Sequence, residues 1–249
     1  MKHLLITFLI FSILISQTKA QQNLFNIPSG DITPKGKFFY QHQINTYSNK
    51  FESKGHFVYG LGKGWDVGVN LVGTGAFFKP ELKPIYNSDF SKGQALSPTI
   101  MATLQKQFTL GEKWAVNVGT QSGVNLTSVK ENVQPAYLHY GLVSYQFKPG
   151  AKILFGPYAT NQQYVGAGNR TGIQMGYEWK VAKDFYLMGD FISGNNDSAV
   201  LVPGIMYNVS NHVQLCLGYM LPNPNTMKNQ AVVFEFNWYG WNYRNNQKH

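Results

Sequence analysis

Cysteine, charged residues and long hydrophobic runs are all scarce in this sequence of 249 residues. The single cysteine, Cys216, excludes an intramolecular disulfide framework and argues against a cysteine-based metal site. Charged residues make up 13% of the chain, which is about half the share of an ordinary soluble protein. Beyond residue 20, no apolar run is long enough for a membrane-spanning helix. Low charge without long apolar runs is therefore difficult to explain in a soluble globular protein.

The start of the chain differs in kind from the rest. A short basic stretch with Lys2 precedes an almost unbroken apolar run over residues 4–15, and a polar stretch then ends at the small residue Ala20. This order predicts a secretory signal peptide over residues 1–20, cleaved near Ala20. The apolar run is too short for a spanning helix, and no cysteine follows Ala20, which argues against a lipoprotein.

Aromatic residues and glycine are abundant, with 15% aromatics and 25 glycines. The mean hydropathy of −0.23 does not exclude a membrane protein, because barrel strands alternate lipid-facing and lumen-facing residues. The net charge of +9 falls to about +7 when two lysines leave with the signal peptide. This excess suits either a solubilising surface or attraction to anionic lipid or solute. The basic residues are scattered, so nucleic acid is not expected as a partner.

Period-two alternation on both sides of a short turn recurs along the chain and predicts β-hairpins. The five hairpin segments are 57–73, 106–123, 144–161, 176–194 and 205–223. Longer polar stretches separate them. These stretches lie at about 47–54, 75–96, 127–134, 161–167, 193–198 and 222–229. Short turns that alternate with long loops are typical of outer-membrane barrels, whereas a soluble sandwich has no reason for this pattern.

Twelve strands follow from this reading. They are expected near 36–46, 54–62, 65–74, 97–108, 114–126, 136–147, 151–160, 168–180, 184–192, 198–208, 212–221 and 230–240. Their lengths suit a tilted crossing of a bilayer, and an even number places both termini on the periplasmic side. The sequence thus predicts an all-β fold, a closed antiparallel up-and-down transmembrane β-barrel. We expect residues 21–249 to form one domain with the barrel core at about 36–240.

One face of each strand is apolar and the other is small or polar. Val67 and Val69, for example, oppose Asp66 and Asn70. In a barrel the polar face lines the lumen, although a soluble β-sandwich shows the same alternation. The candidates for lining the lumen are Gln41, Gln43, Asp66, Asn70, Gln105, Asn117, Gln121, Lys152, Arg170, Gln174, Glu178, Asp190, Gln214 and Glu235.

Large aromatic residues lie beside the short turns. Trp65, Trp114, Trp179 and Phe185 all do so, and Trp238 lies near the chain end on the same expected side. An aromatic girdle at the periplasmic membrane interface would produce this placement. The alternative is that these rings close the bottom of a soluble barrel.

This architecture resembles the small Gram-negative outer-membrane β-barrels of the porin-like and transporter-like kinds. The resemblance covers nearly the whole mature chain but includes no family-specific motif. It implies insertion by the barrel assembly machinery, contact with outer-membrane lipid and a role at the cell envelope. Such barrels end their last strand on an aromatic residue, and here the segment QAVVFEFNWYGWNY is followed by a polar tail over residues 244–249, which is a departure.

The expected function is passive passage of a small, polar solute. A lumen of twelve strands lies between the filled interior of eight strands and the open channel of sixteen, so a plugged, non-transporting envelope barrel or surface-contact receptor remains the alternative. Arg170 and Asp190 are expected to face inward on adjacent strands, either as a charge pair at a constriction or as a structural pair. We expect the loop at 77–94 to be a plain solvated loop, although it is the best candidate among the loops for folding into the mouth or touching a partner.

Catalysis, metals and cofactors find little support in the sequence, and we expect no enzyme. Ser144 and His139 are five residues apart and would face opposite sides of a strand. No G-x-S-x-G elbow occurs, and the histidines are too far apart for metal-ligand spacing. The glycines of VGAGNRTG precede no helical pattern that could hold a phosphate. A lipid-modifying enzyme therefore remains only a minor alternative.

Overall fold

The computed structural model describes residues 23–126 and 133–240, and the predicted signal peptide and polar tail lie outside these ranges. The elements are β1 (Phe38–Thr46), β2 (Lys50–Gly62), β3 (Trp65–Phe77), β4 (Lys83–Pro84), η1 (Phe90–Lys92), β5 (Thr99–Leu110), β6 (Trp114–Asn125), β7 (Pro135–Lys148), β8 (Ala151–Thr160), α2 (Gln162–Val165), β9 (Thr171–Lys180), β10 (Phe185–Ile192), β11 (Val200–Asn208), β12 (Val213–Pro222) and β13 (Ala231–Trp238).

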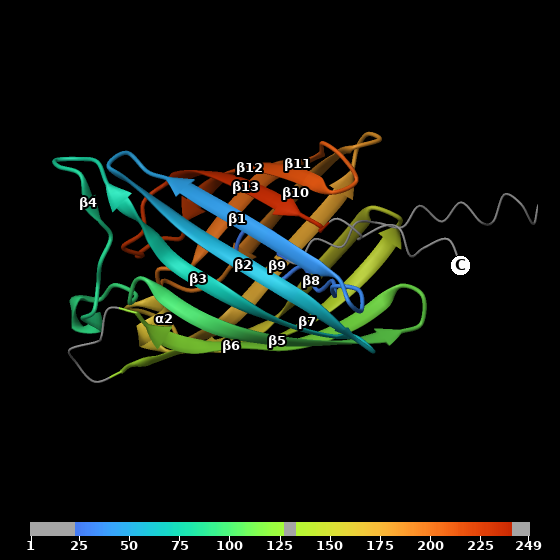
Figure 1. The fold of residues 1–249 in the computed structure, drawn as a ribbon, viewed down its shortest axis with the longest axis horizontal. Coiled ribbons are helices and arrows are strands. Elements are labelled where there is room, and N and C mark those ends of the chain that lie inside the picture. Colours follow the sequence, from blue (N-terminus) through green and yellow to red (C-terminus); the bar gives the residue numbers. More distant parts are fainter. Residues whose placement is uncertain (1–22, 127–132, 241–249) are drawn as a thin grey trace, which may run out of the picture.

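Twelve of the strands form a closed antiparallel barrel, shown from the side in Figure 1. Each strand pairs with its neighbours in sequence, and β1 closes the sheet by pairing with both β2 and β13. The two-residue strand β4 only extends the outer end of β3. Closure satisfies the backbone hydrogen bonds of every wall strand without leaving an open edge, which a bilayer requires. The predicted fold class and strand count are confirmed.

The five predicted hairpins join β2 to β3, β5 to β6, β7 to β8, β9 to β10 and β11 to β12, all at the same end of the barrel. The β2–β3 turn contains only Lys63 and Gly64, both at positive φ, the geometry that a two-residue hairpin turn demands. The opposite end carries the long loops, as predicted, with one exception. The chain turns within residues 47–49, and β2 begins at Lys50 instead of near residue 54.

The error at the start of β2 has a physical cause. Glu52 and Lys54 project inward and make polar contacts there, so their segment reads as a loop in the sequence. A register shift between Ser53 and Lys54 in the pairing with β3 further obscures the alternation. A bulge of this kind adds a residue to one strand and changes the local twist. Because this segment is polar, the predicted strand began near residue 54 and was shorter than β2 as observed.

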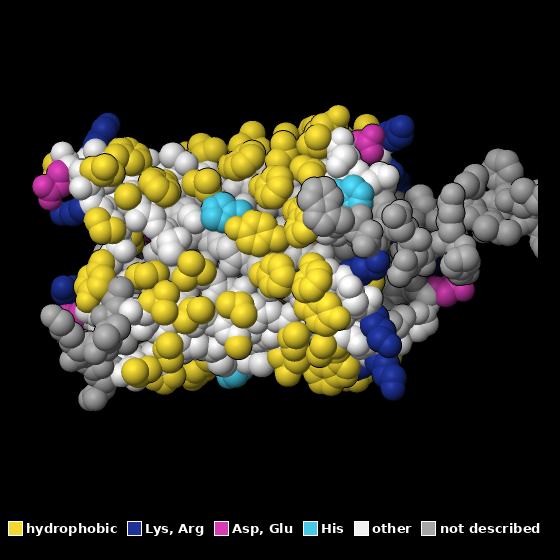
Figure 2. Space-filling model, viewed as in Figure 1, with side chains coloured by type: hydrophobic (Ala, Val, Ile, Leu, Met, Phe, Trp, Pro, Cys, Tyr) yellow, Lys and Arg dark blue, Asp and Glu magenta, His cyan; other side chains and the backbone are white. Residues whose placement is uncertain are grey.

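The outer surface of the wall is apolar. Side chains such as Phe155 and Ile173, exposed by 50% and 51%, alternate along their strands with buried neighbours. Figure 2 shows hydrophobic side chains along the flank of the barrel, whereas Lys, Arg, Asp and Glu gather toward its two ends. An apolar band between two charged rims is the surface that a bilayer solvates. The described residues contain no helix of the length and apolarity needed to cross a membrane.

The aromatic residues beside the short turns form contacts around the rim. The Trp114 ring lies 4.6 Å from Tyr145, and Trp179 lies 6.0 Å from Phe147. The ammonium group of Lys106 lies 5.2 Å from the centre of the Trp65 ring. Trp65, Trp114 and Trp179 are exposed to the surroundings, as rings of an interfacial girdle would be.

Candidate functional site

The first described residues do not belong to the wall. Residues 23–36, here called the plug, enter the barrel from the short-turn end; residues 23–34 lie inside it as far as its middle, and Lys35 and Gly36 are exposed at the rim. Leu24, Phe25 and Ile27 of this segment are completely buried and belong to the largest hydrophobic cluster of the protein. These three large apolar side chains are buried in the lumen and shielded from water. Their burial is favourable and stabilises the plug in this position.

Glycines on the inner wall make room for these side chains. A Cβ atom added at Gly176 on β9 would lie 2.2 Å from Leu24 Cδ1 and 3.0 Å from Ile27 Cδ1. A Cβ atom added at Gly218 on β12 would lie 2.8 Å from the Phe25 ring. Contacts this short do not occur between real side chains, so the absence of a side chain at these positions is what allows the plug to pack against the wall.

Charged groups hold the inner tip of the plug. The carboxylate of Asp190 on β10 accepts hydrogen bonds from the backbone N–H of Asn26 and, at 3.1 Å, from that of Ile27. From the opposite wall, Lys54 Nζ donates to the carbonyl of Phe25 at 2.6 Å and to Asn26 Oδ1 at 3.2 Å. The backbone N–H and C=O groups of the plug thus form hydrogen bonds with charged side chains. These bonds offset the cost of burying the backbone groups away from water.

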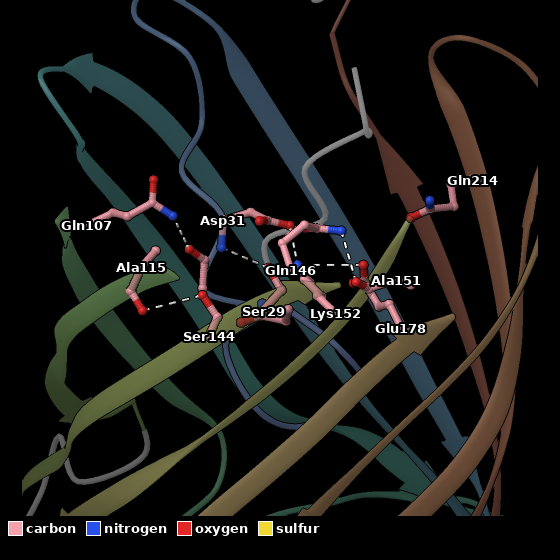
Figure 3. Close-up of polar contacts among 12 residues, drawn as sticks. Ser29, Asp31, Gln107, Ala115, Ser144, Gln146, Ala151, Lys152, Glu178 and Gln214 are labelled. Atoms are coloured by element: carbon pink, nitrogen blue, oxygen red, sulfur yellow. Dashed lines mark hydrogen bonds and ion pairs between the residues drawn. The ribbon is translucent and has the colours of Figure 1, made fainter. Parts of the chain in front are cut away.

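A second set of contacts holds the plug nearer the short-turn end, as Figure 3 shows. Gln107 donates to the carbonyl of Gly30 at 2.6 Å, and Gln105 donates to that of Asp31 at 2.9 Å. The Asp31 carboxylate also forms an ion pair with Lys152 at 2.5 Å, and Lys152 lies 3.5 Å from Glu178. The space beside this ion pair is only about 10 Å³.

Wall residues that contact the plug come from nearly every side of the barrel. They lie on β1 (Gln41), β2 (Lys54), β3 (Asp66), β5 (Gln105 and Gln107), β8 (Lys152), β9 (Gly176), β10 (Asp190) and β12 (Gly218). A segment that contacts strands on nearly every side obstructs the lumen at this level.

Above the plug, the outer half of the lumen contains a cavity of about 370 Å³. Asn26 of the plug and Lys54 of the wall both line it, so the plug forms its floor. The loop between β3 and β5 lies over its mouth, where Ala95 N–H donates to Asp197 at 3.2 Å and Leu96 N–H donates to the Gln163 carbonyl at 2.9 Å. Within residues 77–94, the Gly93 carbonyl accepts a hydrogen bond from Ala167 N–H at 2.7 Å, which holds this part of the loop at the mouth. The volume is near the lower limit of about 300–1,000 Å³ for small-molecule sites.

A charged cluster lies at the side of the cavity. Glu52 accepts hydrogen bonds from Lys50 at 2.6 Å, Lys228 at 2.8 Å and the Tyr47 hydroxyl at 2.9 Å. Burial opposes the charge of Lys228, but Glu52, Tyr47 and Asp197 together outweigh it and raise the lysine pKa above its usual value. Burial raises the pKa of Asp197, and Lys228 partly offsets this effect. Both groups lie in loops outside the spanning strands.

The lumen-lining candidates lie as follows. The side chains of Gln41, Gln43, Asp66, Asn70, Gln105, Asn117, Gln121, Lys152, Gln174, Glu178, Asp190, Gln214 and Glu235 are all buried on the inner face. Arg170 is the exception, because β9 begins at Thr171 and leaves Arg170 exposed in a loop, where it donates to Gln162 at 3.1 Å. The expected pair of Arg170 with Asp190 is wrong, since Asp190 binds the plug instead.

The plug was not predicted from the sequence. Its apolar residues are too few and too irregular to produce a period of two or 3.6. Two signals were nevertheless present: three large apolar residues between the cleavage site and the first strand, and inward-facing glycines at positions 176 and 218 with no partner to explain them. Only the closed barrel brings these distant positions together.

A serine and a histidine meet on the outer surface of the wall. Ser53 Oγ lies 3.3 Å from His42 Nε2, and the Tyr40 hydroxyl lies 3.1 Å from His42 Nδ1. His139 and Ser144 face opposite sides as expected: His139 contacts Thr120, and Ser144 reaches the carbonyl of Ala115. Among the described residues, no cluster of three or more His, Cys, Asp or Glu is arranged to hold a metal ion.

Comparison with known proteins finds similarity in fold. No family model matches the chain, and no curated protein matches it. The structure of KdgM porin in complex with disordered oligogalacturonate is similar with a TM-score of 0.54 at 7% identity, covering 82% of this chain and 99% of that one. NanC porin is similar with a TM-score of 0.54 at 10% identity and the same coverage. The predicted likeness to porin-like outer-membrane barrels is confirmed at the level of fold.

A weaker likeness includes an enzyme. Outer membrane phospholipase A from Escherichia coli has a TM-score of 0.45 at 11% identity, covering 83% of this chain and 93% of that one. A likeness of this size carries no argument about catalysis, because one fold hosts many functions. The chemistry of individual residues must decide that question.

Proposed function

We propose that this protein is a passive outer-membrane channel for a small solute, closed in this conformation by its own plug. Transport then requires residues 23–36 to leave the centre of the lumen. The apolar band, the closed barrel and the fold shared with porins support the location. A cavity that opens outward and ends on the plug supports passage of a solute from the mouth toward the periplasm.

The observation that carries this proposal is the kind of contact that holds the plug. The plug is tethered to β1 by residue 37 and otherwise attached by separable contacts, such as the Asp31–Lys152 ion pair and the hydrogen bonds to Asp190. No wall strand includes any of its residues. The barrel therefore keeps the backbone hydrogen bonds between its wall strands when the plug moves, and among the described residues only the bond at the rim from Gly36 N–H to the Gly60 carbonyl would be lost. A purely structural barrel has no need of a separable filling.

Conductance in planar bilayers tests the proposal. The full chain is expected to show low or infrequent conductance, and a variant lacking residues 23–32 is expected to show steady channels. Heat-modifiable mobility in gels and circular dichroism establish that the truncated barrel is folded. A folded, truncated barrel without conductance would reject transport and favour a non-transporting envelope protein. Equal conductance of both proteins would show that the plug does not close the channel.

A second candidate function is hydrolysis of an ester at the lipid-facing surface, favoured by the contact of Ser53 with His42. A serine nucleophile needs a base within hydrogen-bond reach and a group that orients the base. Tyr40 takes the orienting position here, but a neutral phenol stabilises a protonated histidine less well than a carboxylate would. Labelling by a fluorophosphonate that is lost in Ser53→Ala and kept in Ser122→Ala would support this candidate, and absence of labelling would reject it.

A further inference from the structure

The cavity above the plug has two chemically different walls. Strands β7, β8, β10, β11 and β12 contribute an apolar wall of buried side chains. These are Leu138, Tyr158, Ile192, Val200 and Met220. The wall of β1 and β2 is polar and includes Asn45, Glu52 and Lys54. A ligand that satisfies both walls must carry an apolar body and a polar group.

An unpartnered donor lies between these walls. The side chain of Gln174 on β9 is 2% exposed and lines the cavity, and its Nε2 group has no hydrogen-bond partner among the described residues. A buried donor without an acceptor costs free energy, so an acceptor supplied by a ligand would be stabilising. Lys54 adds a second donor, because an ammonium group has three N–H bonds and its plug contacts use two of them.

The charges around the cavity favour an anion. Three ammonium groups line it, those of Lys50, Lys54 and Lys228, against two carboxylates, those of Glu52 and Asp197. Both carboxylates already accept hydrogen bonds from the protein, Glu52 from two lysines and Asp197 from Ala95 N–H. Among the residues that line it, the cavity therefore has an excess of one positive charge, while Asp190 and Glu235 act on Lys54 from behind the lining. The free donors suit an anionic acceptor.

The outer part of the cavity includes two exposed apolar side chains among polar ones. Tyr86 and Met227 line it and are each 60% exposed, although both lie in outer loops beyond the strands. The loop of Met227 approaches the loop between β3 and β5, since a Cβ atom at Gly93 would lie 3.3 Å from Met227 Sδ. Exposed apolar side chains at a mouth favour capture of a solute that is itself partly apolar.

We propose that this cavity binds a small amphipathic carboxylic acid, one with a compact apolar body and a single carboxylate. The apolar body packs against the wall that includes Leu138 and Met220, and the carboxylate accepts hydrogen bonds from Gln174 Nε2 and Lys54 Nζ. This inference rests on the proposed channel function, because it names the class of solute that the channel takes up.

Three probe compounds separate the contributions to binding. Phenylacetate carries both an apolar ring and a carboxylate, phenylacetamide keeps the ring without the charge, and glucuronate keeps the carboxylate on a polar body. Isothermal titration of the full chain in lipid nanodiscs is expected to show saturable binding of phenylacetate, weaker by about tenfold or more for each of the other two. Equal affinity for all three, or no saturable binding of phenylacetate, would overturn the proposal. Preference for glucuronate would overturn it in favour of a polar acid.

Matched variants locate the binding site. Gln174→Met removes the unpartnered donor at similar volume and leaves the plug contacts intact, so it is expected to weaken phenylacetate binding by about tenfold. Lys92→Met removes a positive charge from an exposed loop position that does not line the cavity, and binding should not change. Unchanged affinity in Gln174→Met would place any binding elsewhere and overturn the assignment.

Failure of this inference can be told apart from failure of the channel proposal. Conductance of the truncated barrel does not depend on the ligand. Steady conductance without phenylacetate binding would leave the channel in place and reject the solute class. Binding that is lost in Gln174→Met, combined with a truncated barrel that never conducts, would instead indicate a receptor for an amphipathic acid.

Discussion

At the scale of single residues, glycine decides where the plug can lie. Strand glycines usually weaken a sheet because they contribute no side chain to packing. On the inner wall of this barrel, Gly176 and Gly218 instead leave the volume that Leu24, Ile27 and Phe25 occupy. A side chain at either position would compete with the plug for the same space.

Substitution of Gly176 by valine should displace the plug. The new Cβ atom would lie 2.2 Å from Leu24 Cδ1, and overpacking of this kind costs about 1–3 kcal/mol. In the proposed mechanism the plug moves and the wall stays closed, so Gly176→Val is expected to raise the conductance of the full chain in planar bilayers. Gly141→Val is the matched control, because a Cβ atom there approaches other atoms no closer than 4.0 Å. Conductance that rises equally in both variants would contradict this explanation.

At the scale of elements, regular alternation explains why the wall could be predicted. Each hairpin contains its own signal, an apolar face of period two on both sides of a short turn, and closure adds no new pattern. The start of β2 was not predicted because Glu52 and Lys54 are charges that face the lumen. Two of the groups that they contact, Lys228 and the plug, lie far away in the sequence. The plug was not predicted for a related reason. Its contacts with Asp190 and Lys152 form only when the barrel is closed.

The loop between β3 and β5 lies over the mouth of the cavity. One of its anchors is the hydrogen bond from Ala95 N–H to the Asp197 carboxylate. Asp197→Ala removes this acceptor, and trypsin is then expected to cut the loop at Lys92 about tenfold faster, since a hydrogen bond to a charged group is lost. Asp184→Ala, at the opposite end of the barrel, should leave the cleavage rate unchanged. A rate that does not respond to Asp197→Ala would show that other contacts fix the loop.

At the scale of the whole molecule, the two surfaces of the sheet have exchanged the roles that they have in a soluble protein. The interior contains amides, carboxylates and lysines around a plug, and the exterior is apolar between charged rims. Such an exterior is stable only where lipid replaces water. The plug gives the interior a small hydrophobic core of its own, which a barrel with an open lumen does not have.

Substituting a lipid-facing residue by arginine at two depths in the membrane tests whether lipid surrounds the apolar exterior. Phe155 lies at the middle of β8 and is 50% exposed, and Phe147 lies near the short-turn end of β7 and is 45% exposed. Arginine at a lipid-facing position costs about 2–4 kcal/mol at the membrane midplane and about 0–1 kcal/mol near an interface. Phe155→Arg should therefore lower the free energy of unfolding in lipid vesicles much more than Phe147→Arg, as measured by tryptophan fluorescence in denaturant. Because the two sites are similarly exposed, equal losses would mean that burial in lipid does not set the cost, and the outer surface of the barrel would need another explanation.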